Sequence, residues 1–427
     1  MNASPFSRSR SFVLSMLFLS HVILYLDRAA LSINATHMQA EFGLTSVQLG
    51  MLFSIFSIGY VVFNMVGGLL ADKFGPKNVL LSCMVVWSLF TGSMALAVSF
   101  LSLIAIRLFF GMSEGPCTTS VNKTVDLWYP PDKKASAMGI SASGSPLGAA
   151  LAGPIVGFIT LKYNWRTSFV IIMFIGFIWA FFWWKYMDKR KTKQTKSESE
   201  INTCSTKSPY KLKLFFYLKQ KTIIASAVAF FSYNYILFFF INWFPSYLIK
   251  MRAFALYDVS IINILPWTLG FVALASGGIV SDFVRRKLNA NKDPLLARRV
   301  VLGFGLLFSA IAVFVADIVS SNVLTIALVS TSIFFLYLTG SIYWGIVNDI
   351  VDSSNVGSVG GIMHGCGNCG GLLAPFITGC FIHLTNDFST AFTVAGIIGS
   401  IGAVLSLLFI RKVDWDSERI KKYIVAS

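Results

Sequence analysis

The chain has 427 residues, of which 55% are hydrophobic and only 13% are charged, and its formal net charge is +16. A soluble domain usually carries about 25% charged residues, so the composition excludes an ordinary soluble protein and indicates an integral protein of the lipid bilayer. The positive charge could suggest a nucleic-acid partner. However, the Lys and Arg residues gather in alternate loops between apolar runs, which is a topology signal of membrane proteins.

Apolar runs divide the chain into twelve candidate membrane helices, each close to the ~20 residues that a spanning helix needs. The first six begin near Phe12, Gln48, Val79, Leu101, Ser136 and Ser168, and the second six begin near Thr222, Asp258, Arg298, Asn322, Val356 and Thr390. The predicted fold class is therefore all-α. The basic loops place both termini in the cytoplasm, as a multi-pass protein of this charge pattern requires.

The two halves of the chain repeat one another. Asp72 lies in a Gly-x-x-x-Asp-Lys-x-Gly-x-Lys string that closes the second run, and Asp282 lies in a weaker copy that closes the eighth. We therefore predict two pseudo-symmetric six-helix bundles, at residues 1–187 and 222–427. They are joined by a polar, Lys-rich cytoplasmic linker at 188–221. Duplicated units of this kind are typical of secondary transporters.

Full charges inside the apolar runs carry the functional signal. Asp27 and Arg28 lie in the first run, and Arg107 and Glu114 lie seven residues apart in the fourth, nearly two helical turns, so both face the same way. A charge near the bilayer centre costs at least ~3 kcal/mol and is tolerated mainly beside a wet cavity or a partner. These four residues therefore indicate a path for a charged substrate, with simple helix-locking ion pairs as the alternative.

The arginine chemistry indicates which substrate group enters. An arginine stays charged and grips a carboxylate at two points. If a substrate carboxylate engages Arg28, the pairing of Arg28 with Asp27 or with a neighbouring glutamate weakens, and the freed acid prefers to take a proton. This exchange is sufficient to couple anion transport to protons. The buried acids favour protons over sodium.

The Gly-x-x-x-Asp-Lys-x-Gly-x-Lys loop at Asp72, its weaker copy at Asp282 and the six-plus-six arrangement of spans resemble the major facilitator superfamily. A narrower resemblance, to the anion:cation symporter family, rests on four strings: Tyr25-Leu26-Asp27-Arg28, Gly59-Tyr60, Arg107-Leu-Phe-Phe-Gly111-Met-Ser-Glu114-Gly-Pro116, and Asn242-Trp243-Phe244-Pro245-Ser-Tyr247-Leu248. That family carries sugar acids and other organic anions with protons or sodium. The resemblance implies that Asp27 and Glu114 carry protons and that Arg28 and Arg107 hold the anion or couple it.

Further candidates line the same expected path. For substrate binding we name Tyr60, Ser145, Tyr343, Trp344 and Asn368, because a hydroxyl or amide can hydrogen-bond a sugar acid and a ring can stack on it. Lipid-facing or interfacial placement is the alternative for the aromatic ones. For gating, the resemblance implies the loop residues Asp72, Lys73, Lys77, Asp282 and Arg285, and simple anchoring of the loops is the alternative. Lys123 is expected to reach water at a helix end.

The sequence thus predicts a proton-coupled symporter of a small organic anion such as an aldonate, aldarate or hexuronate, working by alternating access. Vesicular members of the anion:cation symporter family often have a long, glycosylated loop between the first two spans, so the short loop at 36–47 implies a bacterial inner-membrane member. We also expect the protein to be a monomer. An exporter or exchanger of a carboxylate-bearing metabolite is the alternative, followed by a transporter-like receptor. We expect no enzyme, metal or cofactor, because no metal-ligand spacing, nucleophile elbow or phosphate loop occurs. Cys366 and Cys369 are interpreted as small packing residues.

Overall fold

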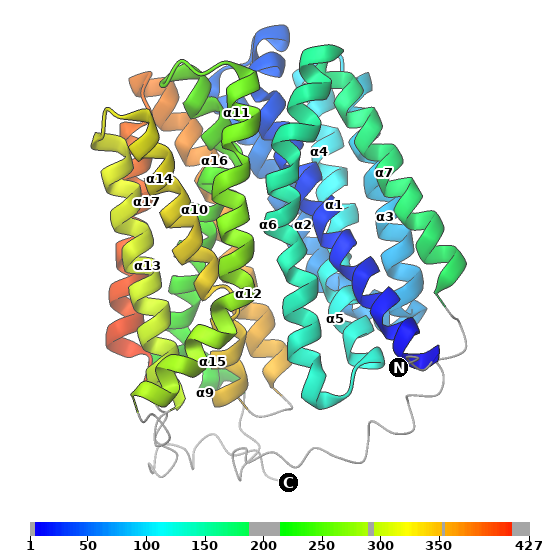
Figure 1. Ribbon diagram of the computed structural model, residues 1–427, viewed down its shortest axis with the longest axis vertical. Helices are drawn as coiled ribbons and strands as arrows, with labels where there is room; N and C mark the ends of the chain where they lie inside the picture. Colours follow the sequence, from blue (N-terminus) through cyan, green and yellow to red (C-terminus); the bar gives the residue numbers. More distant parts are fainter. Residues whose placement is uncertain (1–4, 188–213, 289–293, 352–354, 412–427) are drawn as a thin grey trace. The chain divides into compact units, whose positions relative to one another are not determined.

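The computed structural model describes residues 5–187, 214–288, 294–351 and 355–411, and every regular element in these ranges is a helix (Figure 1). The helices of the first half are α1 (Pro5–Phe42), α2 (Ser46–Phe74), α3 (Pro76–Ser93), the 3₁₀ turn η1 (Met94–Leu96), α4 (Phe100–Glu114), α5 (Pro116–Trp128), α6 (Pro131–Lys162) and α7 (Trp165–Tyr186). Most of the predicted linker lies outside the described residues.

The second half continues from the short helix α9 (Leu214–Leu218). Its helices are α10 (Lys221–Lys250), α11 (Leu256–Ile262), α12 (Ile264–Lys287), α13 (Pro294–Ile318), α14 (Asn322–Thr339), α15 (Ile342–Ile350), α16 (Val356–Thr385) and α17 (Ser389–Phe409). Within the described ranges these elements form twelve spans that are long and apolar enough to cross a membrane. Each span begins within three residues of its predicted start, so the predicted all-α fold is confirmed.

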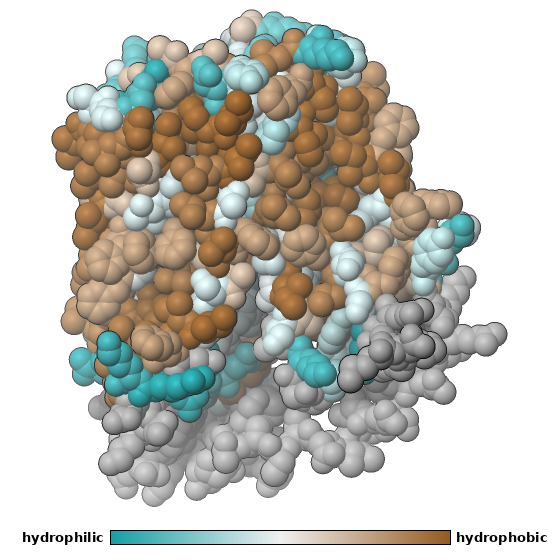
Figure 2. All heavy atoms as spheres, viewed as in Figure 1, coloured by the Kyte–Doolittle hydropathy of each residue, from teal (hydrophilic) through white to brown (hydrophobic). Residues whose placement is uncertain are grey.

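The surface has the pattern that a bilayer requires. On the face shown in Figure 2, hydrophobic side chains cover the middle stretches of the helices, and hydrophilic side chains gather near the helix ends. Apolar side chains in the middle of a span can face lipid without cost, whereas polar ones need water or headgroups. The protein is therefore an integral, multi-pass membrane protein.

Local sequence signals set several helix boundaries. Thr45 accepts a hydrogen bond from the backbone N–H of Gln48 at 3.2 Å, and the Gln48 side chain accepts one from the Thr45 N–H at 2.9 Å, which forms a capping box at the start of α2. Gly75 links α2 to α3 with a φ of +81°, a conformation that favours glycine, and Pro76 then begins α3. The loop that carries Asp72 is thus a tight turn.

Glycines let α2 lie directly on the α4–α5 span. An ideal Cβ on Gly111 would lie only 2.1 Å from the carbonyl oxygen of Phe56, and one on Gly115 would lie 2.8 Å from that of Tyr60. A larger residue at either position would push the helices apart. Small residues drive such close packing in lipid. The rings of Phe56 and Tyr60 are therefore held next to the end of α4.

A second close approach joins α1 to α6. An ideal Cβ on Gly144 would lie 2.3 Å from the carbonyl oxygen of Phe18, and one on Gly148 would lie 2.1 Å from that of Val22. The two glycines are four residues apart, so they form one smooth face of α6. This contact fixes the position of α1, the helix that carries Asp27 and Arg28.

The chain forms two compact units. Unit 1 comprises residues 1–202, 239–271 and 375–388, and unit 2 comprises residues 203–238, 272–374 and 389–427. Unit 1 therefore includes segments from both halves of the sequence. The predicted domain limits at 187 and 222 stay a prediction.

Within unit 1, side chains tie the second-half segments to the first half. Lys250 of α10 donates to Oε1 of Gln39 at 2.6 Å, and the hydroxyl of Ser32 on α1 donates to the carbonyl of Asn242 at 2.9 Å. An ideal Cβ on Gly153 of α6 would lie 2.3 Å from the carbonyl oxygen of Ser260, so α11 is also in close contact with α6. These contacts explain why segments distant in sequence belong to one compact unit.

Replacing Gly148 with Ala should destabilise unit 1, because the added methyl group meets the backbone of α1. Overpacking of this kind costs about 1–3 kcal/mol, so the thermal unfolding midpoint of the purified protein in detergent should fall by several degrees. Gly139→Ala on the same helix is the matched control, because nothing lies within 4 Å of an ideal Cβ at that position. Equal midpoints for the two variants would contradict the close contact of α1 with α6.

Candidate functional site

Arg28 of α1 and Glu114 of α4 form a buried ion pair in unit 1. Oε1 of Glu114 accepts hydrogen bonds from Nε of Arg28 at 2.8 Å and lies 2.6 Å from its Nη2. The side chains are only 8% and 0% exposed. Oε2 of Glu114 has no hydrogen-bond partner among the described residues. Glu114 therefore holds the arginine with one oxygen and keeps the other available.

Three aromatic rings surround the guanidinium group of Arg28. Its Cζ lies 5.0, 4.7 and 4.8 Å from the ring centres of Tyr25, Phe56 and Tyr60. Ring faces attract cations by about 0.5–2 kcal/mol each, with the larger values at desolvated sites. The hydroxyl of Tyr60 also lies 3.2 Å from that of Thr118 on α5, which fixes the ring. The rings thus orient Arg28 and lower the cost of its burial.

Phe56 was missed by the sequence analysis, although its spacing could have revealed it. It lies four residues before Tyr60, on the same face of α2. Its ring centre is also 5.2 Å from Cζ of Arg107, so one ring contacts both buried cations. An aromatic ring between two guanidinium groups keeps like charges near each other without direct contact.

Arg107 is a buried arginine of α4 that lies against aromatic rings. It is only 4% exposed, and its Cζ lies 4.7 Å from the ring centre of Phe110. Among the described residues it forms no ion pair, and its Nε has no hydrogen-bond partner. An unpaired buried arginine is costly. Arg107 is therefore suited to bind an anionic group of a substrate.

Asp27 belongs to the same buried group of charges but is not the partner of Arg28. It is 2% exposed and lies within electrostatic reach of Glu114 and Arg107. No ion pair joins Asp27 to Arg28 among the described residues, and its Oδ1 has no hydrogen-bond partner there. The sequence left open whether Asp27 or a neighbouring glutamate pairs with Arg28, and the structure shows that it is Glu114. We call Asp27, Arg28, Arg107 and Glu114 the charged cluster.

The other predicted substrate residues are divided between the units. Ser145 lies buried on α6 in unit 1. In unit 2, the ring centres of Trp344 and His364 are 5.3 Å apart, and Nδ2 of Asn368 lies 3.4 Å from Nδ1 of His364. Trp344 is 37% exposed, whereas Tyr343 is fully buried. Trp344 and Asn368 therefore form one group, and their substrate roles stay predictions.

The burial of Tyr343 limits what its ring can do in this structure. Its ring centre lies 4.6 Å from that of Phe230, and its hydroxyl lies 3.4 Å from both the Ala229 carbonyl and the Thr339 hydroxyl. Stacking on a sugar would need a ring face that protein atoms now cover. The predicted stacking role of Tyr343 therefore requires a different arrangement of these side chains.

The predicted gating residues lie at helix ends. Asp72 forms an ion pair with Lys123 of α5, a partner that the sequence analysis did not foresee. Lys77 is buried and donates to the carbonyl of Met187, while Lys73 and Arg285 are exposed. The side chain of Asp282 lies outside the described part of the structure. The gating roles stay predictions.

A second charged pair was also missed. Arg298 at the start of α13 lies 2.8 Å from Asp349 at the end of α15, and Arg285 of α12 is close enough to affect the same carboxylate. The sequence analysis gave neither residue of this pair a functional role. Basic residues at the start of one span and an acid at the end of another were the only available signal.

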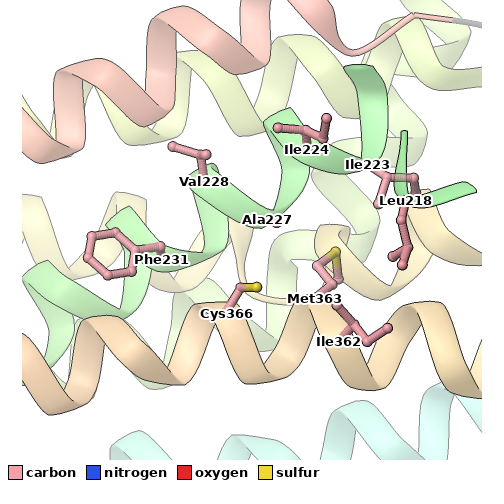
Figure 3. Close-up of a pocket in the computed structure, with 9 residues that line it drawn as sticks. All are labelled: Leu218, Ile223, Ile224, Ala227, Val228, Phe231, Ile362, Met363 and Cys366. Atoms are coloured by element: carbon pink, nitrogen blue, oxygen red, sulfur yellow. The ribbon is translucent and has the colours of Figure 1, made fainter. Parts of the chain in front are cut away.

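An apolar cavity of about 450 Å³ lies in unit 2 between α9, α10 and α16 (Figure 3). Its lining consists of Leu218, Ile223, Ile224, Ala227, Val228, Phe231, Ile362, Met363 and Cys366. No charged side chain is among them, so this cavity does not suit an organic anion.

Cys366 and Cys369 are both exposed, so their interpretation as packing residues is wrong. Within the described ranges, no three His, Cys, Asp or Glu residues are grouped to hold a metal ion.

The family described as the Major Facilitator Superfamily matches residues 17–292, which is more than half of the chain. The chain belongs to the major facilitator superfamily. It is 47% identical over 408 residues to a hexuronate transporter of Bacillus subtilis (strain 168), covering 96% of each chain. It is 29% identical to a "probable galactarate/D-glucarate transporter" of the same organism, covering 94% of this chain and 91% of the relative. These relatives also confirm the predicted anion:cation symporter type within the superfamily.

A solved transporter structure has the same fold. The crystal structure of a bacterial homologue of the human lysosomal transporter Spinster, in an inward-facing and occupied conformation, matches with a TM-score of 0.69. The match covers 96% of this chain and 95% of the Spinster homologue, at 18% sequence identity. At this identity the likeness concerns the fold alone.

Arg28→Ala should destabilise the protein strongly, because Glu114 would stay buried without its cation. Breaking a buried ion pair costs about 3–5 kcal/mol, whereas an exposed pair contributes about 0–1 kcal/mol. Arg166→Ala is the control, since Arg166 pairs with Glu41 at 2.6 Å with both side chains at least 33% exposed. Thermal unfolding in detergent should show the larger fall for Arg28→Ala, partly restored in Arg28→Ala/Glu114→Gln. A larger fall for Arg166→Ala would contradict this account.

Proposed function

We propose that this protein is a transporter, not an enzyme, that imports a hexuronate or a closely related sugar acid together with protons. The observation that carries the proposal is that one oxygen of a fully buried glutamate, Glu114, holds Arg28. The high identity to a hexuronate transporter over nearly the whole chain supports the substrate class. The basic loops support a location in the bacterial inner membrane with both termini in the cytoplasm.

The exchange of carboxylates on Arg28 gives the coupling step. A substrate carboxylate can accept the same Nε and Nη2 donors that Glu114 accepts, because both present two oxygens to the flat guanidinium group. When the substrate takes this position, Glu114 loses its cation while it stays in a dry site. An unpaired buried carboxylate is costly, so Glu114 then binds a proton.

The charge balance of the cluster favours one proton for each unit of substrate charge. Two arginines and two ionised acids are neutral together. A monoanionic sugar acid adds one negative charge, and one proton on Glu114 or Asp27 restores neutrality. The same acids that balance the arginines serve as proton acceptors, so no separate sodium site is needed. This economy favours protons over sodium.

Other side chains complete the proposal. Arg107, which forms no ion pair with any residue that the structure describes, is the second cation available to the anion. Tyr60, Ser145, Tyr343, Trp344 and Asn368 are proposed to contact the hydroxyl groups and the ring of the sugar acid. The ion pair of Asp72 with Lys123 is proposed to act in gating, together with Lys73, Lys77, Asp282 and Arg285. We propose that the protein acts as a monomer.

Proton-driven uptake into proteoliposomes tests the coupling. With an acidic exterior, the wild-type protein should accumulate labelled glucuronate or galacturonate, and a pH-sensitive dye should report proton entry. Glu114→Gln should keep counterflow exchange at near wild-type rates but lose proton-driven accumulation at least tenfold. Glu41→Gln is the matched control, because Glu41 is a partly exposed acid that also pairs with an arginine.

Three outcomes would contradict parts of the proposal. Accumulation that needs a sodium gradient and ignores the pH gradient would remove the proton as the coupling ion. Net export of the sugar acid under an inward proton gradient would favour the exchanger alternative. Equal loss of exchange and accumulation in Glu114→Gln would remove Glu114 as the coupling group.

A ligand-induced thermal shift tests the substrate class and the role of Arg28. Hexuronates should raise the unfolding midpoint of the wild-type protein, and the neutral hexoses of the same shape should not, because they lack the carboxylate that Arg28 binds. Arg28→Ala should lose this shift, whereas Arg166→Ala should keep it. A retained hexuronate shift in Arg28→Ala would show that another group binds the anion.

A further inference from the structure

Three polar side-chain atoms, one on Asp27 and two on α3, are buried without well-formed hydrogen bonds. They are Oδ1 of Asp27, Nε1 of Trp87 and the hydroxyl oxygen of Thr91, on side chains that belong to residues 2%, 0% and 3% exposed. The large majority of buried side-chain polar atoms in proteins have a hydrogen-bond partner. Three unpaired groups in one region therefore need a physical explanation.

The two α3 residues face the carboxylate together. Trp87 and Thr91 are four residues apart, so both lie on one face of α3. Each lies close enough to the carboxyl group of Asp27 to act on it as a side-chain hydrogen-bond donor, although neither reaches the geometry of a well-formed hydrogen bond. The indole can only donate, whereas the hydroxyl can donate or accept. A small rotation of the Asp27 side chain is enough to complete such bonds.

The surroundings of Asp27 contain few other ionisable groups. On α4, Glu114 and Arg107 act on it. On its own helix, Arg28 is engaged by Glu114, and His21 lies 3.2 Å from the hydroxyl of Ser141 on α6. On α3, Cys83 is a buried thiol within electrostatic reach of Glu114. Trp87 and Thr91 are thus the neutral donors that face Asp27.

We propose that Trp87 and Thr91 are positioning residues for the proton that Asp27 carries. When Asp27 is ionised, the indole N–H and the hydroxyl donate to its carboxylate. When Asp27 is protonated, its carboxyl O–H donates to the hydroxyl oxygen of Thr91, and the indole N–H donates to the neutral carboxyl C=O, which is a weaker acceptor than the carboxylate. Trp87 and Thr91 thus hold the carboxyl group of Asp27 in one orientation while it binds and releases its proton. This inference rests on the proposed proton coupling.

The proposal predicts a displaced pH profile. Trp87→Phe and Thr91→Val remove one donor each with little change of shape. A carboxylate that loses a donor holds its proton up to a higher pH. The midpoint of the pH dependence of proton-driven uptake should therefore move up by about one unit, a tenfold change in proton concentration. Counterflow exchange at a fixed acidic pH should stay near the wild-type rate.

Ser88→Ala is the matched control on the same helix. The hydroxyl of Ser88 is also buried without a partner, but it faces α7, because an ideal Cβ on Gly176 would lie 1.9 Å from it. Its removal should leave the midpoint unchanged. Thr91→Ser keeps a hydroxyl group and should restore the wild-type midpoint, which a purely steric role of Thr91 would not predict.

The outcomes separate this inference from the proposed function. If wild-type uptake ignores pH, the proton coupling itself fails. If wild-type uptake depends on pH, but Trp87→Phe and Thr91→Val keep the wild-type midpoint and normal exchange, the positioning role is wrong. A shift that Ser88→Ala shares equally would also overturn it, because the effect would then come from loosening α3. Exchange rates and unfolding midpoints identify any variant that fails to fold, and whichever of Trp87→Phe and Thr91→Val folds then carries the test.

Discussion

The ion pair between Arg28 and Glu114 is the interaction on which the charged cluster depends. Removing two charges from water costs several kcal/mol for each ion, and the interior of a bilayer contains no water that could solvate them. The protein offsets this cost in two ways. One glutamate oxygen takes two contacts from the guanidinium group, and three aromatic rings face the arginine. A pair built this way is stable, yet it can exchange its anion for another carboxylate.

The packing of α2 on α4 places this pair. Gly111 and Gly115 allow the backbone of α2 to approach closely, and Pro116 then begins a new helix after Glu114. The same close approach holds Phe56 and Tyr60 against the guanidinium group. The stretch from Gly111 to Pro116 of the fourth span thus supplies Glu114 and the helix boundary that follows it. The same stretch is the surface on which α2 packs, and α2 carries two of the rings around Arg28.

The two buried acids have different surroundings, and this difference suits a stepwise mechanism. Glu114 is held by a cation, so its proton affinity depends on whether Arg28 is engaged elsewhere. Asp27 faces neutral donors of α3, and the arginine that acts on its carboxyl group is Arg107, which forms no ion pair with it. The proton affinity of Glu114 therefore depends directly on the substrate, whereas that of Asp27 depends on the donors of α3. Two neighbouring acids in identical surroundings would also bind protons in two steps, but neither acid would be fixed as the first.

The sequence by itself determined the twelve spans and their starts, because hydrophobic length is a local property of the chain. It also marked Asp27, Arg28, Arg107 and Glu114, because the cost of a charge in lipid needs no partner to be recognised. Only the tertiary structure decided that Arg28 pairs with Glu114, that Lys123 pairs with Asp72, and that donors of α3 face Asp27. Such pairings depend on how helices far apart in sequence are rotated and shifted against each other, and no spacing within one helix encodes that.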